Sequence, residues 1–304
     1  MAFSLGHTLV IANPASQSGA GAEGAEFVRR TLAAYESATD GFDVRLTTGP
    51  KAATDMAAAA TSFDTVLALG GDGVIHEVVN GLMKIDDDHR PRLGVIPLGS
   101  GNDYARTLGM VPNDPDKSLA QILRGTTRRV DLGLVNGTYF DETLSFGVDA
   151  AIAIDTMERR LATGAHGTRL FAASGIDVIR REMRRWPFRA TIDGEPVEGC
   201  SVIFTIQVGP TYGGGFRICP DARLDDGLLD VCISHPPITP AGAAAIFLMA
   251  KGGNHTRLGR MELHQAPKVH VEFDEMPAAQ VDGERIEART FDVEVLPAAL
   301  RVLR

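Results

Sequence analysis

The sequence is poor in cysteine, in aromatic residues and in long apolar runs, and these scarcities exclude several classes of protein. It has three cysteines in 304 residues, and no two of them form a C-x-x-C pair. We therefore expect a reducing compartment, with neither a disulfide framework nor a zinc site. The most apolar later stretch, residues 241–250, is about half as long as a membrane-spanning helix must be.

Basic residues are also in the minority. The chain has 30 Lys and Arg against 39 Asp and Glu, which gives a formal net charge of −9. A general nucleic-acid-binding protein usually carries a basic face, so we expect no nucleic-acid partner. The opening segment MAFSLGHTLVIANP lacks the basic region and long apolar core of a signal peptide. We therefore expect a soluble, cytoplasmic protein.

Short apolar runs alternate with helical patterns in the first 130 residues. The pattern predicts helices within residues 24–37, 52–62, 74–84 and 118–125, and it predicts strands within residues 8–13, 42–48, 64–71 and 92–100. Strands that alternate with helices indicate βαβ units and a parallel sheet, with ligands at the carboxyl ends of the strands.

After residue 130, strand-like segments dominate. Hairpin signals stand at IDGEPV (residues 192–197) and VDGERI (residues 281–286), and helical patterns cover about residues 155–185 and 240–251. The fold class is therefore an α/β nucleotide-binding domain, a parallel sheet with flanking helices, followed by a mostly antiparallel, β-sandwich-like domain. We place the first domain at residues 1–130 and the second at 131–292, and we expect residues 293–304 to pack back onto the first domain.

One motif points to a dinucleotide. Residues 19–24 have the G-x-G-x-x-G spacing and follow a predicted strand. In a dinucleotide-binding fold the first of these glycines follows the strand at once. Here the five residues PASQS intervene, so we interpret the glycines as part of a helix entry and not as a nicotinamide or flavin site.

Two glycine-rich turns carry more specific information. In LALGGDGVIHEVVNGL (residues 67–82) an apolar strand ends in GGDG just before a helix, and such a turn admits phosphate oxygens to the backbone. Asp72 would repel phosphate unless Mg²⁺ lay between them, so it is a candidate for metal positioning; a tight turn with an exposed Asp is the alternative. HEVVN lacks the second histidine of a zincin motif, so His76 is not predicted to bind zinc.

The second turn, in IPLGSGNDYARTLG (residues 96–109), repeats this pattern at the next strand end. Asn102 and Asp103 are of the residue types that cap a following helix. Two such turns at neighbouring strand ends predict one cleft.

At this point the sequence resembles the diacylglycerol kinase catalytic-domain superfamily, which includes soluble bacterial lipid kinases, sphingosine kinases and ceramide kinases. The resemblance covers nearly the whole chain, in blocks that follow the family order: NPASQSG, LTTGPKAA, GGDGVIHEVVNG, PLGSGNDYAR, VDLGLVNG, GGGFRICPDARLDDGLLDV and QVDGE. NAD kinases share GGDG, but the PLGSGNDYAR and DARLDDGLLDV blocks differ from them.

The resemblance implies roles for particular residues. Glu284 would be the general base, with Asp72 beside it in the reaction. Asp226 and the backbone oxygens of Arg223 and Leu228 would bind a structural Mg²⁺, linked through water to Asp72 and Asp131. ATP would be lined by Asn13, Pro14, Ala15, Ser16, Gln17, Thr47, Gly71, Asp72, Gly73, Val74, Ile75, His76, Glu77 and Ser100.

Three residues depart from the family pattern: Gln17 replaces a usual glycine, Val74 a usual threonine and His76 a common asparagine. The acidic residues expected to do the chemistry are present, including Asp72, Asp226 and Glu284. The second DGE, at Glu195, is assigned to an exposed turn.

A lipid kinase visits a membrane without spanning it, so the resemblance also implies transient contact at the inner membrane surface. Residues 176–188 place four arginines beside Trp186 and Phe188 and are the candidate for that contact; a solvated helix face with a buried Trp is the alternative. The resemblance favours diacylglycerol as the acceptor and phosphatidic acid as the product. An NAD kinase-like enzyme and a non-catalytic nucleotide or lipid sensor are the competing hypotheses, and a homodimer stays open.

Overall fold

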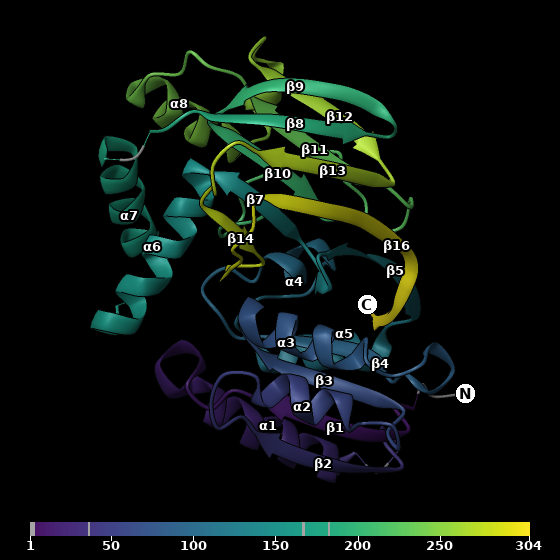
Figure 1. Cartoon of the computed structure of the whole chain (residues 1–304). Coiled ribbons are helices and arrows are strands. Elements are labelled where there is room, and N and C mark those ends of the chain that lie inside the picture. Colours follow the sequence, from purple (N-terminus) through teal and green to yellow (C-terminus); the bar gives the residue numbers. More distant parts are fainter. Residues whose placement is uncertain (1–3, 36, 166–167, 182) are drawn as a thin grey trace. The chain divides into compact units, whose positions relative to one another are not determined.

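The computed structural model describes residues 4–35, 37–165, 168–181 and 183–304 (Figure 1). The chain divides into two compact units. The first comprises Met1–Val130 together with Ala298–Arg304, and the second comprises Asp131–Pro297. Strands β5 (Thr127–Val135) and β16 (Thr290–Leu303) each run from one unit into the other along the chain.

The first unit contains the predicted parallel sheet. Its strands are β1 (His7–Ala12), β2 (Gly41–Leu46), β3 (Thr65–Gly70) and β4 (Arg92–Pro97), in the order β2-β1-β3-β4, and the end of β16 joins in parallel beside β4. Strands β1, β3 and β4 are buried almost throughout. Continuous apolar runs are typical of parallel strands that are covered on both faces.

Helices connect these strands. They are α1 (Ala20–Ala34), α2 (Ala52–Ala58), α3 (Asp72–Leu82), α4 (Asp103–Thr107) and α5 (Pro115–Arg124), with short 3₁₀ turns at Ser16–Gly19 and Asp87–His89. Helix α2 packs on α3, and α1 packs on α5. The chain leaves β1 toward β2 on one side and returns to β3 on the other, so the strand order reverses between β1 and β3. Ligands of open α/β sheets bind beside the carboxyl ends of the strands at such a reversal.

The second unit is built from two layers of antiparallel strands. In one layer, β13 (Lys268–Phe273) pairs with the first half of β16 and with β8 (Trp186–Ile192), β8 pairs with β9 (Glu195–Ser201), and β5 pairs with β6 (Thr138–Phe140). The other sheet has the order β12 (Met261–Ala266), β11 (Leu229–Ser234), β10 (Ile203–Gln207), β7 (Thr143–Gly147), β14 (Ala279–Val281) and β15 (Glu284–Arg285).

Phenylalanines from both layers form the core of this unit. Phe146 of β7 lies 4.6 Å from Phe291 of β16 and 5.0 Å from Phe273 of β13, and Phe204 of β10 lies 5.1 Å from Phe188 of β8, measured between ring centroids. Such offset and edge-on pairs stabilise a core beyond the burial of their area. The predicted fold class, an α/β domain and a β-sandwich-like domain, is therefore confirmed.

Helices α6 (Val148–Thr163), α7 (Thr168–Arg181) and α8 (Pro240–Ala250) belong to the second unit. The helical pattern at residues 155–185 contains α7 and overlaps α6, which begins seven residues earlier than predicted, and the second pattern is α8. A 3₁₀ turn follows at Asn254–Arg257. Within the described ranges, no helix combines the length and the apolar character that crossing a bilayer requires.

Only part of the segment predicted to contact a membrane is exposed to solvent. Trp186 is 8% exposed and Phe188 is 2% exposed, because both belong to β8 and point into the core. The aromatic part of that prediction is therefore wrong, and the alternative of a buried Trp holds. The arginines Arg180, Arg181, Arg184 and Arg185 are exposed, and Arg184 pairs with Glu275 at 3.3 Å, whereas Glu182 lies outside the described residues.

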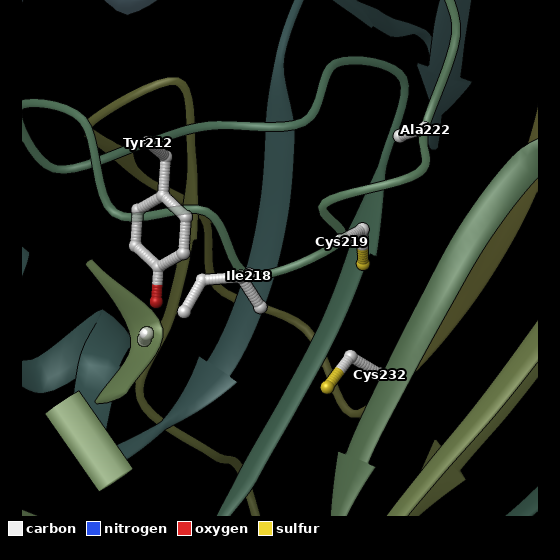
Figure 2. Close-up of a cluster of buried hydrophobic side chains, with 6 residues drawn as sticks. Tyr212, Ile218, Cys219, Ala222 and Cys232 are labelled. Carbon is white, nitrogen blue, oxygen red and sulfur yellow. The ribbon is translucent and has the colours of Figure 1, made fainter. Parts of the chain in front are cut away.

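A second buried cluster surrounds two of the three cysteines. Figure 2 shows Tyr212, Ile218, Cys219, Ala222 and Cys232 beside one another. Cys200, Cys219 and Cys232 are all free thiols, as their spacing predicts. Burial raises the pKa of the Cys232 thiol to about 12, so this thiol is protonated and unreactive at neutral pH.

Candidate functional site

The predicted nucleotide residues of the first unit follow the carboxyl ends of its parallel strands. Residues 13–17 follow β1, Thr47 follows β2, residues 71–77 follow β3, and Ser100 lies just after β4. Backbone hydrogen bonds align these strand ends: the Asn13 N–H donates to Leu69 O at 3.0 Å, and the Thr47 N–H donates to Ala12 O at 2.9 Å. The structure therefore brings these loops to one edge of the sheet.

The two glycine-rich turns pack directly against each other. A Cβ atom on Gly99 would lie 2.4 Å from the Cα of Gly71, and one on Gly71 would lie 3.2 Å from the Cα of Gly99. The Leu98 N–H also donates to Gly70 O at 2.7 Å. Only glycine allows this approach, so the two turns form one surface made largely of backbone.

Asp72 joins these turns through its carboxylate. One oxygen accepts a hydrogen bond from the Asn102 N–H and the other accepts one from the Asp103 N–H, both at 2.8 Å. Desolvation and the neighbouring carboxylate of Asp103 raise the pKa of Asp72 to about 6, although the two backbone donors act in the opposite direction. Asp72 thus fixes the second turn, and its role toward a metal stays a prediction.

The prediction that Asn102 caps α4 is wrong, because another side chain accepts the hydrogen bonds at this helix start. Asn102 occupies the N-cap position with φ of 55°, but its side chain makes no capping hydrogen bond. The free N–H groups at this helix start are bound instead by Asp72, which lies 30 residues earlier in the chain. A sequence window around the helix cannot reveal a capping group supplied from that distance.

Glu77 serves a similar function at another helix. Its carboxylate accepts hydrogen bonds from the Lys51 N–H at 2.9 Å and the Ala53 N–H at 3.0 Å, at the start of α2. Its neighbours Val74, Ile75 and His76 are buried in α3. Glu77 therefore holds the loop after Thr47 against α3, and direct contact with a nucleotide stays a prediction.

Gln17 occupies an unusual backbone conformation in the first loop. Its φ is 47° and its ψ is 50°, and Ser18 and Gly19 also have positive φ. A residue with a Cβ costs roughly 1–2 kcal/mol in this left-handed region, so glycine, which the resemblance implies here, would adopt it without that cost. The side-chain amide donates hydrogen bonds to Gly99 O at 2.8 Å and to the Oδ1 of Asn113 at 2.6 Å.

The glycines of the G-x-G-x-x-G spacing have packing roles. A Cβ on Gly21 would lie 1.9 Å from Asn13 O, and one on Gly24 would lie 3.3 Å from the Leu98 side chain. These residues let α1 lie close to the first loop and to β3. They account for the spacing without a dinucleotide.

In the second unit, Asp226 lies in a tight turn that Asp131 holds. The Oδ2 of Asp131 accepts a hydrogen bond from the Gly227 N–H at 2.7 Å, and the Asp131 N–H donates to Leu224 O at 2.7 Å. Gly227 has φ of 74°, and the Oδ1 of Asp226 accepts from the Leu228 N–H at 3.1 Å. Asp131 is buried, while Asp226 is exposed.

The oxygen atoms at this turn are of the kinds that bind Mg²⁺. Carboxylate and backbone carbonyl oxygens are the ligands that this ion takes, usually together with several waters. Asp226 supplies an exposed carboxylate, and Arg223 and Leu228 supply backbone oxygens on the same turn. No group of three or more His, Cys, Asp or Glu side chains is arranged around a metal position in the part of the chain described, so most ligands would be backbone and water.

Glu284 follows a two-residue hairpin turn between β14 and β15. Asp282 and Gly283 have φ of 46° and 93°, as a D-G turn of this kind requires. The Asp282 carboxylate accepts hydrogen bonds from the N–H groups of Asp141, Glu142 and Thr143 at 2.8–3.2 Å, and the Gly283 N–H donates to the Oε1 of Gln280 at 2.6 Å. Glu284 itself is exposed.

Sequence reasoning missed Gln280 and Asn113, and it assigned Asn102 to a helix cap instead of to the hydrogen bonds that hold the second turn. Gln280 and Asn102 are almost completely buried, and Asn113 has a left-handed backbone. The only local signals are Asn or Asp at positions of positive φ. Gln280 donates to the Oγ of Ser145, 135 residues away, and Asn113 accepts from Gln17, 96 residues away, so no short motif records these contacts.

Comparisons with known proteins agree with this architecture. Residues 7–135 match the diacylglycerol kinase catalytic domain, and residues 142–304 match the YegS C-terminal NAD kinase beta sandwich-like domain. The chain is 33% identical over 227 residues to a diacylglycerol kinase of Bacillus subtilis, which covers 75% of this chain and 73% of that protein. It is 33% identical over 283 residues to a YegS-like probable lipid kinase of Pseudomonas aeruginosa, with 92% and 90% covered.

The fold is also that of a solved structure. A crystal structure of a diacylglycerol kinase from Bacillus anthracis superposes with a TM-score of 0.77 at 24% identity, covering 98% of this chain and 96% of that one. Since both halves of the chain match in order and the relatives align over most of their length, the chain belongs to the diacylglycerol kinase and YegS-like lipid kinase family.

Proposed function

We propose that this protein is an ATP- and Mg²⁺-dependent kinase that phosphorylates a lipid hydroxyl, with diacylglycerol as the acceptor and phosphatidic acid as the product. The observation that carries the proposal is the packing of Gly71 against Gly99, with Asp72 bonded to the second turn, at the strand ends of the first unit. The similarity to the diacylglycerol kinase of Bacillus subtilis supports the choice of acceptor.

The first unit supplies the nucleotide loops. Backbone without side chains at Gly71, Gly73 and Gly99 admits phosphate oxygens, and the start of α3 offers N–H groups and a positive dipole end to them. We assign the contacts with ATP to the residues predicted from the sequence: Asn13, Pro14, Ala15, Ser16, Gln17, Thr47, the stretch 71–77 and Ser100.

The second unit supplies Glu284 and Asp226 to the transfer, and the first unit supplies Asp72. The acceptor oxygen attacks the γ-phosphorus, a new P–O bond forms, the bond to the bridging oxygen breaks, and ADP leaves. Glu284 accepts the proton of the acceptor hydroxyl. When bound, Mg²⁺ neutralises charge on the phosphates, and Asp226 with the backbone oxygens of Arg223 and Leu228 would hold a structural ion.

A lipid acceptor also requires contact with a membrane surface. The exposed side chains Arg180, Arg181 and Arg185 at and after the end of α7 are the part of the predicted segment that anionic headgroups would attract. We propose that the protein works at the cytoplasmic face of the membrane as a peripheral enzyme.

The test is incubation with labelled ATP, Mg²⁺ and separate acceptors: diacylglycerol, monoacylglycerol, sphingosine, ceramide, phosphatidylglycerol, undecaprenol and NAD. We expect label in phosphatidic acid. Label in NAD and in no lipid would make the protein an NAD kinase-like enzyme. ATP binding without label in any acceptor would favour a sensor that has lost turnover.

A further inference from the structure

Three polar residues with left-handed backbone form one hydrogen-bonded group in the first unit, and two of them donate to the same backbone carbonyl. Gln17, Asn102 and Asn113 have φ of 47°, 55° and 60°. They come from three different segments: the loop after β1, the second glycine-rich turn and the segment before α5. Around Gly99 O their side chains form one hydrogen-bonded group.

Two acceptor oxygens in this group bind the same two amide nitrogens. The carbonyl oxygen of Gly99 accepts from the Nε2 of Gln17 and from the Nδ2 of Asn102, each at 2.8 Å. The Oδ1 of Asn113 accepts from the same two nitrogens, at 2.6 Å and 3.3 Å. Because a backbone carbonyl can only accept, the nitrogen of each amide must face Gly99, which fixes both amide orientations.

The group is also hydrogen-bonded to Asp72 in the first glycine-rich turn. The Asn102 N–H donates to the Asp72 carboxylate, and Asn102 is fully buried. Gln17 is exposed and is the sole member of the group that belongs to the loop after β1. The side chain of Gln17 therefore connects that loop to the second glycine-rich turn and to Asn113.

We infer that Gln17 is a positioning residue that fastens the first nucleotide loop to the second glycine-rich turn and so holds the loop in place for ATP. This inference rests on the proposed function, because it takes ATP as the ligand of these loops. A loop held in its bound conformation before binding loses less entropy when the ligand arrives. Gln17 would thus strengthen ATP binding without contacting the reacting atoms.

A purely structural role of Gln17 would give a different experimental result. A residue that only stabilised the fold would gain from relief of its left-handed backbone. Replacement by glycine would then leave ATP binding unchanged and raise or preserve stability. A positioning residue loses its function in that same replacement, because the two donated hydrogen bonds disappear.

The test compares Gln17→Gly with Gln17→Met in the full-length protein. Glycine removes both the strain and the donors, whereas Met keeps the length and the strain but removes the donors, without adding charge near the phosphates. Asp193→Gly, at φ of 51° in a hairpin of the second unit, is the control for strain relief alone. The measurements are the dissociation constant of ATP with Mg²⁺ by calorimetry, the KM for ATP and kcat by labelled-phosphate transfer, and the Tm.

We expect both Gln17 variants to weaken ATP binding by about five- to tenfold, the effect of one or two net hydrogen bonds, with a matching rise in KM and a smaller change in kcat. The Tm should fall only in Gln17→Met. Asn113→Gly, which keeps the left-handed backbone and removes one acceptor, should weaken binding too, and its effect should not add fully to that of Gln17→Gly.

The outcomes separate this inference from the proposed function. If the unmodified protein binds ATP and Gln17→Gly binds it equally well, Gln17 is not a positioning residue, while the kinase proposal stands. If the unmodified protein does not bind ATP, the proposed function fails and this inference fails with it.

Discussion

Asp282 and Thr143 exchange two hydrogen bonds although 139 residues separate them. The Thr143 N–H donates to the Oδ1 of Asp282 at 2.8 Å, and the Asp282 N–H donates to Thr143 O at 2.9 Å. The other D-G hairpin has the same backbone, with φ of 51° at Asp193 and 84° at Gly194, yet its aspartate carboxylate accepts no such hydrogen bond in the described parts of the chain. The two hairpins share a local turn and differ in their anchoring.

That difference makes Glu284 and Glu195 a matched pair for testing the general base. Glu284→Gln keeps the size of the side chain and removes its basicity. Because Glu284 is exposed, the Tm and the affinity for ATP should be unchanged, while kcat should fall by about 10²–10⁴-fold, the usual contribution of a positioned base. Glu195→Gln should leave kcat unchanged. Equal and small effects of the two variants would remove Glu284 from the mechanism.

The turn at Asp226 should respond to magnesium. A metal that binds only the native state stabilises it, by about 1.4 kcal/mol at a concentration about ten times its Kd. Asp226→Ala should therefore weaken the Mg²⁺ dependence of both the Tm and the activity. Asp225→Ala, the neighbouring exposed acid that lies 3.6 Å from Arg223, is the control and should respond to Mg²⁺ like the unmodified protein. If Asp226→Ala behaves like this control in both assays, the metal assignment is wrong.

Asp149 predicts a pH dependence of stability. It is 2% exposed, and burial raises its pKa to about 6 from the ordinary 3.8, although the Tyr212 hydroxyl donates a hydrogen bond to it at 2.6 Å. A raised carboxyl pKa means that the folded state binds the proton more tightly than the unfolded state. Its contribution to stability is therefore complete below about pH 4 and is lost as the pH rises through about 6.

Asp149→Asn should remove this dependence, since the amide oxygen still accepts from Tyr212 and carries no charge. A shift of about two pKa units corresponds to about 3 kcal/mol, which bounds the expected gain in the free energy of unfolding at pH 7.5. Urea unfolding at pH 4.5, 6.0 and 7.5 measures the free energy of unfolding of each protein, with the exposed Asp193→Asn as control. Parallel pH profiles for Asp149→Asn and the unmodified protein would show that Asp149 does not titrate in this range.

Local patterns of the sequence predicted the elements that depend on neighbouring residues. The apolar runs that became β1, β3 and β4 are buried on both faces, and both D-G signals became turns with positive φ, because these outcomes follow from periodicity and from the conformational range of single residues. The exposed turn assigned to Glu195 is of this kind.

The same patterns could not predict the contacts that hold the loops. Asp72 binds the start of α4, Gln17 binds Gly99 from 82 residues away, and Asp282 binds the start of β7. Each contact pairs an ordinary polar side chain with backbone from a distant segment, so no periodicity or motif records it. Trp186 was misassigned for the related reason that basic neighbours in the sequence do not show which face of a strand its side chain occupies.

The contact between Gly99 and Gly71 predicts a strong effect of a single methyl group. In Gly99→Ala the new Cβ would lie 2.4 Å from the Cα of Gly71 and 2.9 Å from the Oδ1 of Asn102. Neither neighbour can yield easily, because one is backbone and the other is a fully buried side chain. We expect a loss of about 1–3 kcal/mol in the free energy of unfolding, the usual cost of overpacking, and weaker ATP binding as the two turns separate.

Gly49→Ala, where a Cβ meets nothing within 4 Å, is the control and should change the free energy of unfolding by less than about 0.5 kcal/mol. Urea unfolding and calorimetry with ATP measure both effects. If Gly99→Ala were as stable as Gly49→Ala and bound ATP normally, the close packing of the two turns would not be what shapes the site.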